Sequence, residues 1–203
     1  MDKEYTCCLF SGINLQLGNN LTGTIKAVYI LKSQNITIDN VICQDLNDNN
    51  TTDLQIIYFN DSSNVAIQNS QFNITHQYNS LTAIHIGNSV SALTNNQIII
   101  TSNTNIEEYG IYMRNNKFDT SGYQTIIQNC DVKLENNTST SNSIAVYSYD
   151  SYASIYNTIL SSKTASGTNG IALFSNNDMS SPFFDNLTNV LSLIHNTDNI
   201  TDD

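Results

Sequence analysis

Residues 35–40, Asn35-Ile-Thr-Ile-Asp-Asn40, alternate apolar and polar side chains between two asparagines. The pattern returns four times along the chain, as Asn64-Val-Ala-Ile-Gln-Asn69, Val90-Ser-Ala-Leu-Thr-Asn95, Gln124-Thr-Ile-Ile-Gln-Asn129 and Tyr152-Ala-Ser-Ile-Tyr-Asn157. The closing asparagines are separated by 29, 26, 34 and 28 residues. Recurrence at a nearly fixed spacing is typical of a repeat protein, in which each unit packs on its neighbours.

A second phrase lies between these asparagines and repeats with the same rhythm. It reads Ile57-Tyr-Phe59, Ile84-His-Ile86, Ile111-Tyr-Met113, Ile144-Ala-Val146 and Ile171-Ala-Leu173, in steps of 27, 27, 33 and 27 residues. Both phrases lengthen in the same repeat, around 117–122 and 135–143. This shared lengthening predicts a loop inserted into one unit, with the register of the phrases kept on either side.

Each phrase alternates with period two and is rich in β-branched residues, which predicts strands with one buried face. A unit of about 27 residues with two or three short strands cannot bury its apolar face alone, so the units must stack. The stack that fits is an all-β parallel β-helix, a single-stranded solenoid of about six or seven coils. One asparagine per coil suits a tight left-handed corner, where stacked amides can bond from coil to coil. The predicted Asn column is Asn40, Asn69, Asn95, Asn129 and Asn157.

These phrases resemble the right-handed parallel β-helix superfamily of pectate-lyase-like proteins, whose repeats read roughly Asn-Ile-x-Ile-x-Asn followed by Gly-Ile-x-Leu-x-Asn. The resemblance covers about residues 28–173. It implies a right-handed coil. It leaves the function open, because the superfamily includes polysaccharide lyases and hydrolases, phage tailspikes, adhesins and structural shafts.

The length of 203 residues predicts one β-helix domain over 1–203. Within it, 1–23 is an N-terminal coil or cap, and 178–203, which holds the single proline, Pro182, is a last irregular coil or cap. A solenoid leaves strand edges at both ends of its stack, so a protein partner or self-association is expected there.

The charge balance excludes some partners. A formal net charge of −11 with seven Lys and Arg disfavours the phosphate backbone of a nucleic acid. No apolar run approaches the roughly 20 residues of a spanning helix, so membrane insertion is not expected. The N-terminal residues lack a secretory signal pattern, so the localisation stays open, with an extracellular, cell-surface or virion location favoured.

The alternation places Tyr112 and Arg114, the only arginine, on the outer face of their strand. Stacking equivalent residues predicts two outward columns: Tyr29, Tyr58, His85, Tyr112, Ala145 and Ala172, and Leu31, Asn60, Gly87, Arg114, Tyr147 and Phe174. Aromatic faces beside a guanidinium suit the apolar faces and the carboxylates or hydroxyls of a sugar chain. The candidate glycan-binding residues are Tyr58, His85, Tyr109, Tyr112, Arg114 and Tyr147. Plain aromatic stacking that stabilises the coil is the alternative.

Few residues of the two outward columns are of the types that catalyse the cleavage of polysaccharides, and no catalytic residue is assigned. The two outward columns contain no Asp or Glu, whereas a glycosidase needs two facing carboxyls and a lyase of this superfamily typically has a calcium-bound carboxylate cluster with a basic residue. His85, Tyr112 and Arg114 could exchange a proton beside a uronate. Carboxylates folded over Arg114 would favour an enzyme, with Glu107, Glu108 and Asp119 as the candidates.

No cofactor or metal is expected. The segment 45–56 slightly resembles a calcium loop but has Asn50 and Ile56 where such a loop needs Gly and Glu, so a solvated turn is favoured. The repeat register sets Cys43 and Cys130 three coils apart, about 14 Å, too far for a disulfide. Four free thiols are therefore expected, with Cys43 as an apolar filler.

These patterns favour a non-enzymatic surface, fibre or virion module with a structural or assembly role, which can hold glycans on its Tyr/His/Arg face. The alternative is a carbohydrate-active enzyme, a polysaccharide lyase before a glycoside hydrolase.

Overall fold

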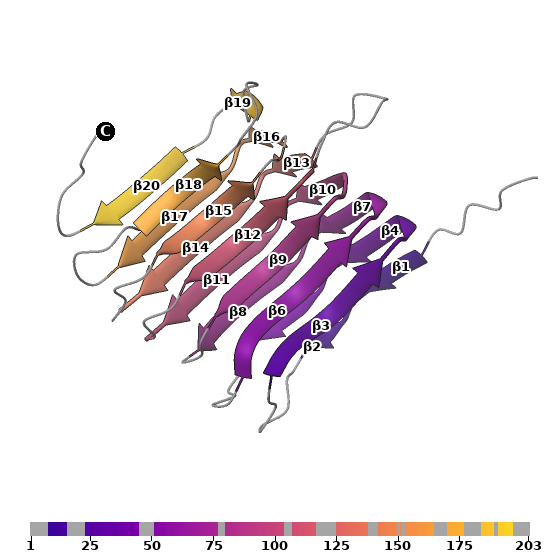
Figure 1. Cartoon of the computed structure of the whole chain (residues 1–203), viewed down its shortest axis with the longest axis horizontal. Helices are drawn as coiled ribbons and strands as arrows, with labels where there is room; N and C mark the ends of the chain where they lie inside the picture. The colour runs from indigo at the N-terminus through magenta and orange to yellow at the C-terminus, as the bar shows by residue number, and fades with distance from the viewer. Residues whose placement is uncertain are drawn as a thin grey trace, which may run out of the picture.

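The structure is a computed structural model that describes residues 8–15, 23–44, 51–76, 80–103, 107–116, 125–137, 142–149, 151, 153–164, 170–176, 184–188 and 191–196. These residues form twenty strands, with no helix among them. Successive strands turn from one sheet to the next, so that each sheet collects every third strand along the long axis of the molecule (Figure 1). All neighbouring strands are parallel, which confirms the predicted parallel β-solenoid.

Three sheets, here called A, B and C, form the walls. Sheet A contains β1 (Cys8–Ser11), β4 (Gln34–Asp39), β7 (Ser63–Gln68), β10 (Ser91–Thr94), β13 (Thr125–Gln128), β16 (Ala153–Tyr156) and β19 (Phe184–Thr188). Sheet B contains β2 (Asn14–Leu15), β5 (Ile42–Gln44), β8 (Gln71–His76), β11 (Gln97–Ser102), β14 (Asp131–Asn136), β17 (Ile159–Thr164) and β20 (Leu191–Asn196). Sheet C contains β3 (Gly23–Leu31), β6 (Thr51–Asn60), β9 (Leu81–Gly87), β12 (Glu108–Arg114), β15 (Ser143–Tyr149) and β18 (Gly170–Asn176).

Four successive turns have every strand paired on both sides: β4–β6, β7–β9, β10–β12 and β13–β15. The sequence predicted six or seven coils, and this number is corrected to about four complete turns of this kind. The reason lies at the ends. Strands β3 and β18 are the edges of sheet C. Strands β19 and β20 begin another turn, but the described residues contain no strand of sheet C that would complete it.

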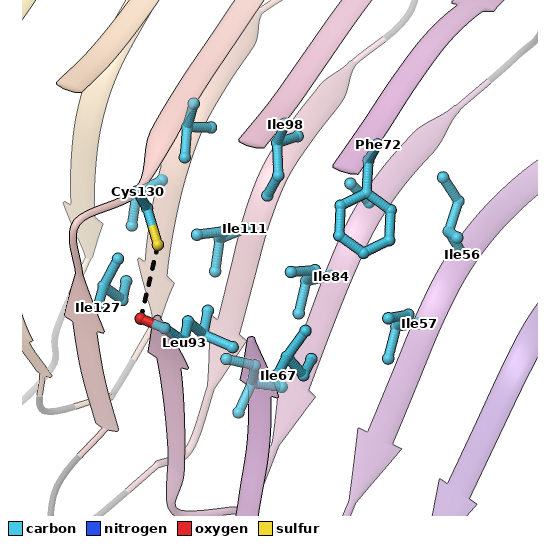
Figure 2. Packing of buried hydrophobic residues seen from close by; sticks show 14 of the residues in the cluster. Ile56, Ile57, Ile67, Phe72, Ile84, Leu93, Ile98, Ile111, Ile127 and Cys130 are labelled. Atoms are coloured by element: carbon cyan, nitrogen blue, oxygen red, sulfur yellow. Dashed lines mark hydrogen bonds between the residues drawn. The ribbon is translucent and has the colours of Figure 1, made fainter. Parts of the chain in front are cut away.

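The core runs along the inside of the solenoid. Isoleucines dominate it, with Ile56, Ile67, Ile84 and Ile98 fully buried and Phe72 packed among them (Figure 2). Inward residues of one turn lie beside those of the next and form rows along the solenoid. One row is apolar throughout and contains Ile38, Ile67, Leu93, Ile127 and Ile155, whereas Ser91 and Thr125 interrupt another. A fully buried aliphatic or aromatic side chain of this size stabilises the fold by about 1.5–3 kcal/mol.

The corner between sheets A and B carries the predicted Asn column. Each of its five asparagines adopts a left-handed backbone, with φ between 46° and 55°. Asn95 Nδ2 donates to Asn69 Oδ1 at 3.2 Å, and Asn129 Nδ2 donates to Asn95 Oδ1 at 3.2 Å. Asn69 Nδ2 instead donates to Asp39 Oδ1 at 2.8 Å, so the amide column begins on a carboxylate.

A second row of polar side chains lies buried behind a left-handed corner, at the turn from sheet C to sheet A. There the backbone N–H of Ser62 donates to Ser89 Oγ at 3.0 Å, and that of Ser89 donates to Asn116 Oδ1 at 2.9 Å. Each side chain thus accepts from the backbone of the preceding turn. This accounts for the buried polar residues at this corner, because a buried N–H without an acceptor is costly.

The register between β12 and β15 differs from the predicted one. Ile111 pairs with Val146 and Tyr112 with Tyr147, whereas the sequence phrases placed Ile111 opposite Ile144. Ala145 and Ala172, predicted to face outward, are fully buried. The error is two residues, which equals the period of a strand, so alternation alone could not reveal it.

A different signal marks the true register. The strands of sheet C bend where the alternation breaks. In β9, β12 and β15 two consecutive residues are buried there, and the first of the two is small: Ala83, Gly110 and Ala145. Ala172 takes the same place in β18. A Cβ on Gly110 would lie 2.6 Å from the Ala145 carbonyl oxygen and 2.5 Å from the Val132 side chain. The position in β12 therefore has no room for a side chain, although β6 holds the buried Ile56 at the equivalent place.

The cysteines and the ends complete the fold. Cys8, Cys43 and Cys130 are free thiols, and Cys43 is buried in the core as predicted, while Cys7 lies outside the described residues. Cys130 Sγ donates to the Leu93 carbonyl at 3.5 Å (Figure 2). Strands β1 and β2 fall within the predicted N-terminal coil, and β19 and β20 within the predicted last coil. The described part of the chain contains no helix, and therefore none that is long and apolar enough to cross a membrane.

Candidate functional site

An aromatic ladder runs along the outer face of sheet C. Its six rings come from equivalent positions in six consecutive strands, in the order Tyr29, Tyr58, His85, Tyr112, Tyr147 and Phe174. Neighbouring ring centroids are 5.3, 4.4, 4.9, 5.0 and 5.2 Å apart. The spacing follows from the distance between parallel strands, which brings equivalent side chains within stacking contact. We call these six residues the aromatic ladder.

Tyr109 covers one side of the ladder. Its ring meets the edges of Tyr112 and Tyr147 at centroid distances of 5.1 and 5.3 Å. Its hydroxyl donates to Glu107 Oε2 at 2.7 Å, which fixes the ring in place. Tyr109 precedes the bend in β12 and Tyr112 follows it, so both rings face outward although an odd number of positions, three, lies from one to the other.

Lys26 occupies the same column as Tyr109, three turns earlier along sheet C. Its ammonium lies 3.6 Å from the centroid of Tyr58 and 4.6 Å from that of Tyr29. A cation over an aromatic face is attracted by the ring quadrupole, an effect of about 0.5–1 kcal/mol at an exposed site. The ladder therefore carries a positive charge at its N-terminal end.

Arg114 lies at the end of β12, on the opposite side of the ladder from Tyr109. It pairs with Gly87 in one neighbouring turn and with Tyr149 in the other. The guanidinium carbon lies 5.8 Å from the centroid of the Tyr149 ring. The predicted neighbour across this turn was Tyr147, and the two-residue correction of the register replaces it by Tyr149.

A hollow of about 200 Å³ opens beside Arg114. It is lined by Tyr58, Asn60, His85, Gly87, Asn88, Arg114 and Asn115. Gly87 forms part of its wall, and a Cβ at that position would overlap Asn60 Oδ1 and lie 3.6 Å from His85 Nε2. The missing side chain at residue 87 therefore keeps the hollow open between the ladder and Arg114.

The electrostatics of the ladder favour neutral rings near pH 7. Burial lowers the pKa of His85 to about 4, assisted by the positive charges of Lys26 and Arg114. Burial also raises the pKa values of Tyr58, Tyr112 and Tyr147. The pKa of Tyr109 is raised by burial and by its hydrogen bond to Glu107. The phenols stay protonated and the imidazole neutral, so this face offers hydrogen-bonding groups and ring faces, with few groups prepared to accept a proton.

The candidate carboxylates lie away from Arg114. Glu107 accepts from Tyr109, and Glu108 is buried and accepts from Ser143 Oγ at 3.3 Å. No ion pair joins Arg114 to a carboxylate of the described residues. Asp119 lies outside those residues, as do 45–50 of the calcium-loop candidate. Where the chain is described, no group of three His, Cys, Asp or Glu side chains could hold a metal ion.

The structure brings together all six predicted candidates: Tyr58, His85, Tyr109, Tyr112, Arg114 and Tyr147. Sequence reasoning left Lys26, Tyr149 and Phe174 out of this set. A pairing of strands based on the small residue before the bend would have placed Tyr149 and Phe174 correctly. Lys26 carried no such signal, because its contact with Tyr58 depends on where a long flexible side chain lies.

Comparisons with protein-family models, with curated proteins and with solved structures found no match for this chain.

Proposed function

We propose that this protein is a non-enzymatic structural module that binds glycans on the outer face of sheet C. The observation that carries the proposal is the aromatic ladder, whose half-buried rings stack in register and are bordered by Lys26, Tyr109 and Arg114. Sugar rings have apolar faces that pack on aromatic side chains, and hydroxyls that bond to amides, phenols and guanidinium groups. A linear glycan lying along the solenoid axis would meet one aromatic ring per turn.

Two features support a binding role over stacking alone. The ladder has a hollow beside it, and the absence of a side chain at Gly87 keeps that hollow open. In addition, Tyr109 wedges against Tyr112 and Tyr147 and makes the face uneven, so that a ligand can be held in one place. A ladder that served only to stabilise the coil would need neither feature.

The assembly part of the proposal rests on the N-terminal end of the stack. Among the described residues, strands β1 and β3 are edge strands, and they expose Leu9, Phe10, Tyr29 and Leu31 with 64%, 44%, 54% and 43% of their surface accessible. Unpaired edges with apolar side chains are sites where another chain can add. We place such a module in an extracellular, cell-surface or virion assembly.

The proposal also covers the handedness of the coil and the relation of this protein to a known superfamily. Connections between parallel strands of one sheet are right-handed in about 98% of cases, so we expect right-handed turns. The repeat phrases support kinship with the pectate-lyase-like superfamily. A crystal structure would decide the hand directly, and left-handed turns would contradict both statements.

The test is a glycan-binding screen of the wild-type protein and Tyr112→Ala, with Tyr156→Ala as the matched control. Tyr156 is an outward tyrosine on sheet A, away from the ladder. We expect one class of polysaccharide to co-elute with the wild-type protein and with Tyr156→Ala, and to lose at least tenfold in affinity with Tyr112→Ala. Equal retention by all three proteins, or by none, would reject the ladder as a binding face.

The same experiment tests the enzymatic alternative. The size distribution of each polysaccharide, measured by chromatography with light scattering after incubation, should stay unchanged. Chains that become shorter with the wild-type protein but not with Arg114→Ala would show a carbohydrate-active enzyme instead of a binding module.

A further inference from the structure

We propose that the hollow beside Arg114 is an oxyanion site, and that the glycan on the aromatic ladder carries carboxylate or sulfate groups that enter it. This inference rests on the proposed function and adds the chemical class of its ligand. Three observations support it: the distribution of cations without an ion pair among the described residues, the size of the hollow, and its donors. A nearby carboxylate opposes the anion and provides a test.

The positive charges of the described residues divide into two groups. Lys133 and Lys163, on sheet B, form ion pairs with Asp131 and Glu135 at 2.7 and 2.9 Å. The other three cations, Lys26, Lys32 and Arg114, have no carboxylate partner within the described part of the chain. All three lie on sheet C or directly after one of its strands.

This distribution is unexpected in a chain with a formal net charge of −11. Eighteen carboxylates are available to only seven cations, and yet Lys26 and Arg114 on sheet C, and Lys32 directly after β3, have no ion pair where the chain is described. An acidic protein repels polyanions at long range, so any polyanion that binds it must meet a local positive site. Sheet C supplies that site.

The hollow has the size and donors that an oxyanion needs. Its volume of about 200 Å³ exceeds that of a carboxylate or sulfate with a few waters, since one water takes up about 30 Å³ of liquid. Arg114 is exposed, and its guanidinium has five N–H donors in a fork that matches the two oxygens of a carboxylate or sulfate. Neutral His85 can donate from one ring nitrogen, and Asn115 lines the same space.

One negative group lies close to the hollow. Asp61 follows Asn60 at the corner. Burial raises the pKa of Tyr58, which lines the hollow, and the charge of Asp61 adds to this shift. Its two oxygens accept from Asn60 Nδ2 at 3.0 Å and from Asn88 Nδ2 at 3.1 Å. These bonds hold the carboxylate at the corner. Its negative charge should weaken the binding of an anion in the hollow. Removing that charge should therefore tighten binding.

The first experiment tests the site with free anions. Arg114 is the only arginine, so its Nε–Hε signal in a ¹H–¹⁵N NMR spectrum is unambiguous. We expect this signal to shift saturably with sodium sulfate and with sodium acetate at constant ionic strength. The dissociation constant should fall at least threefold in Asp61→Asn, which keeps a residue suited to the left-handed backbone with φ of 51°. Gly87→Ala, which fills the hollow, should abolish the shift.

The second experiment asks whether the anion is carried by a polysaccharide. The probes are dextran, carboxymethyl dextran and dextran sulfate of one chain length, with hydroxyethyl and carboxymethyl cellulose as a second backbone. We expect the charged forms to bind at least tenfold more tightly than the neutral forms. Arg114→Gln should remove this preference, whereas Lys163→Gln, which removes an equal charge from sheet B, should keep it.

The outcomes separate the two proposals. Equal binding of neutral and charged chains, lost in Tyr112→Ala but unchanged in Arg114→Gln, overturns the oxyanion site and leaves glycan binding intact. A preference for charged chains that survives Arg114→Gln also overturns it. If no polysaccharide binds while free sulfate still shifts the Arg114 signal, the glycan source of the anion is overturned together with the proposed function.

Discussion

Tyr112 and Tyr147 stack face to face, with centroids 5.0 Å apart and 7° between their planes, across the loop that lengthens the chain between β12 and β15. The insertion therefore leaves the outer face of sheet C unbroken. The ladder continues through it from Tyr29 to Phe174, which gives a ligand a row of rings instead of two separate halves.

The interaction between these two rings should be measurable as a coupling energy between two substitutions. We expect a double-mutant cycle of Tyr112→Leu and Tyr147→Leu to give about 0.5–1.5 kcal/mol in the free energy of unfolding, the range found for aromatic pairs. Urea unfolding of the four proteins measures it. A coupling of zero would mean that the two rings do not touch in solution.

The register of β15 can be tested at Ala145, which is fully buried although the repeat phrases placed it outside. Ala145→Leu should destabilise the protein by about 1–3 kcal/mol, because added methyl groups strain a packed core. Ala66→Leu is the control, since Ala66 lies half-exposed on the outer face of sheet A and should change stability by less than about 0.5 kcal/mol. Similar effects at the two sites would restore the register predicted from sequence.

The Asn column acts through its backbone. Asn95 has an exposed side chain and φ of 55°. We expect Asn95→Ala to cost about 1–2 kcal/mol, the penalty of an ordinary residue in the left-handed region, while Asn95→Gly costs less. Asn73→Ala, at an exposed position on β8, is the control and should be nearly neutral. If Ala and Gly at residue 95 were equally harmful, the loss would have to come from the amide bonds and not from the backbone.

The half-buried histidine makes stability depend on pH. The pKa of His85 is about 4 in the folded protein and about 6.5 in the unfolded chain, so between these values the unfolded state binds the additional proton. The stability associated with neutral His85 is complete above about pH 6.5 and is lost as the pH falls towards 4. We expect wild type to lose roughly 1–2 kcal/mol more than His85→Tyr between pH 7 and pH 5.

Unfolding free energies of the two proteins at several pH values test this difference. The subtraction removes the contributions that both proteins share, such as that of Asp39, whose pKa is lowered by its hydrogen bonds to Asn69 and Gln68. Parallel pH profiles would contradict a histidine that folding keeps neutral.

The two buried thiols should resist alkylation. Burial raises the pKa of Cys43 to about 12 and also raises that of Cys130, so little thiolate forms at pH 8. We expect iodoacetamide to modify neither residue in the folded protein and both in urea, as measured by peptide mass spectrometry. Rapid labelling of Cys43 in native buffer would show that the core opens.

Much of the fold could be predicted from particular residues. The recurrence of Asn69, Asn95 and Asn129 fixed the stacking unit, and the alternation in Ile111-Tyr-Met113 fixed which side chains face outward. The bend before Ile111 was missed, because two consecutive buried residues break the alternation that the prediction relied on. That single break displaced Ala145 and Tyr147 by two positions.

The candidate site was predicted less completely. The sequence placed Arg114 beside Gly87 and among Tyr58, His85 and Tyr112, since period-two alternation and a constant coil length determine these neighbours. It did not place Lys26 over Tyr58, nor Glu107 on the Tyr109 hydroxyl. Such contacts depend on rotamers and on segments without a repeat.

The sequence by itself determined the parallel solenoid, its asparagine corner and the outward direction of Tyr112 and Arg114, because a repeat makes every turn report the same local geometry. Only the tertiary structure decided which rings stack across the insertion, that Gly87 leaves a hollow beside Arg114, and that Glu107 bonds to Tyr109 instead of Arg114. The physical reason is that local alternation sets which way a side chain points, whereas its neighbours in the next turn depend on the length and path of the loop between them.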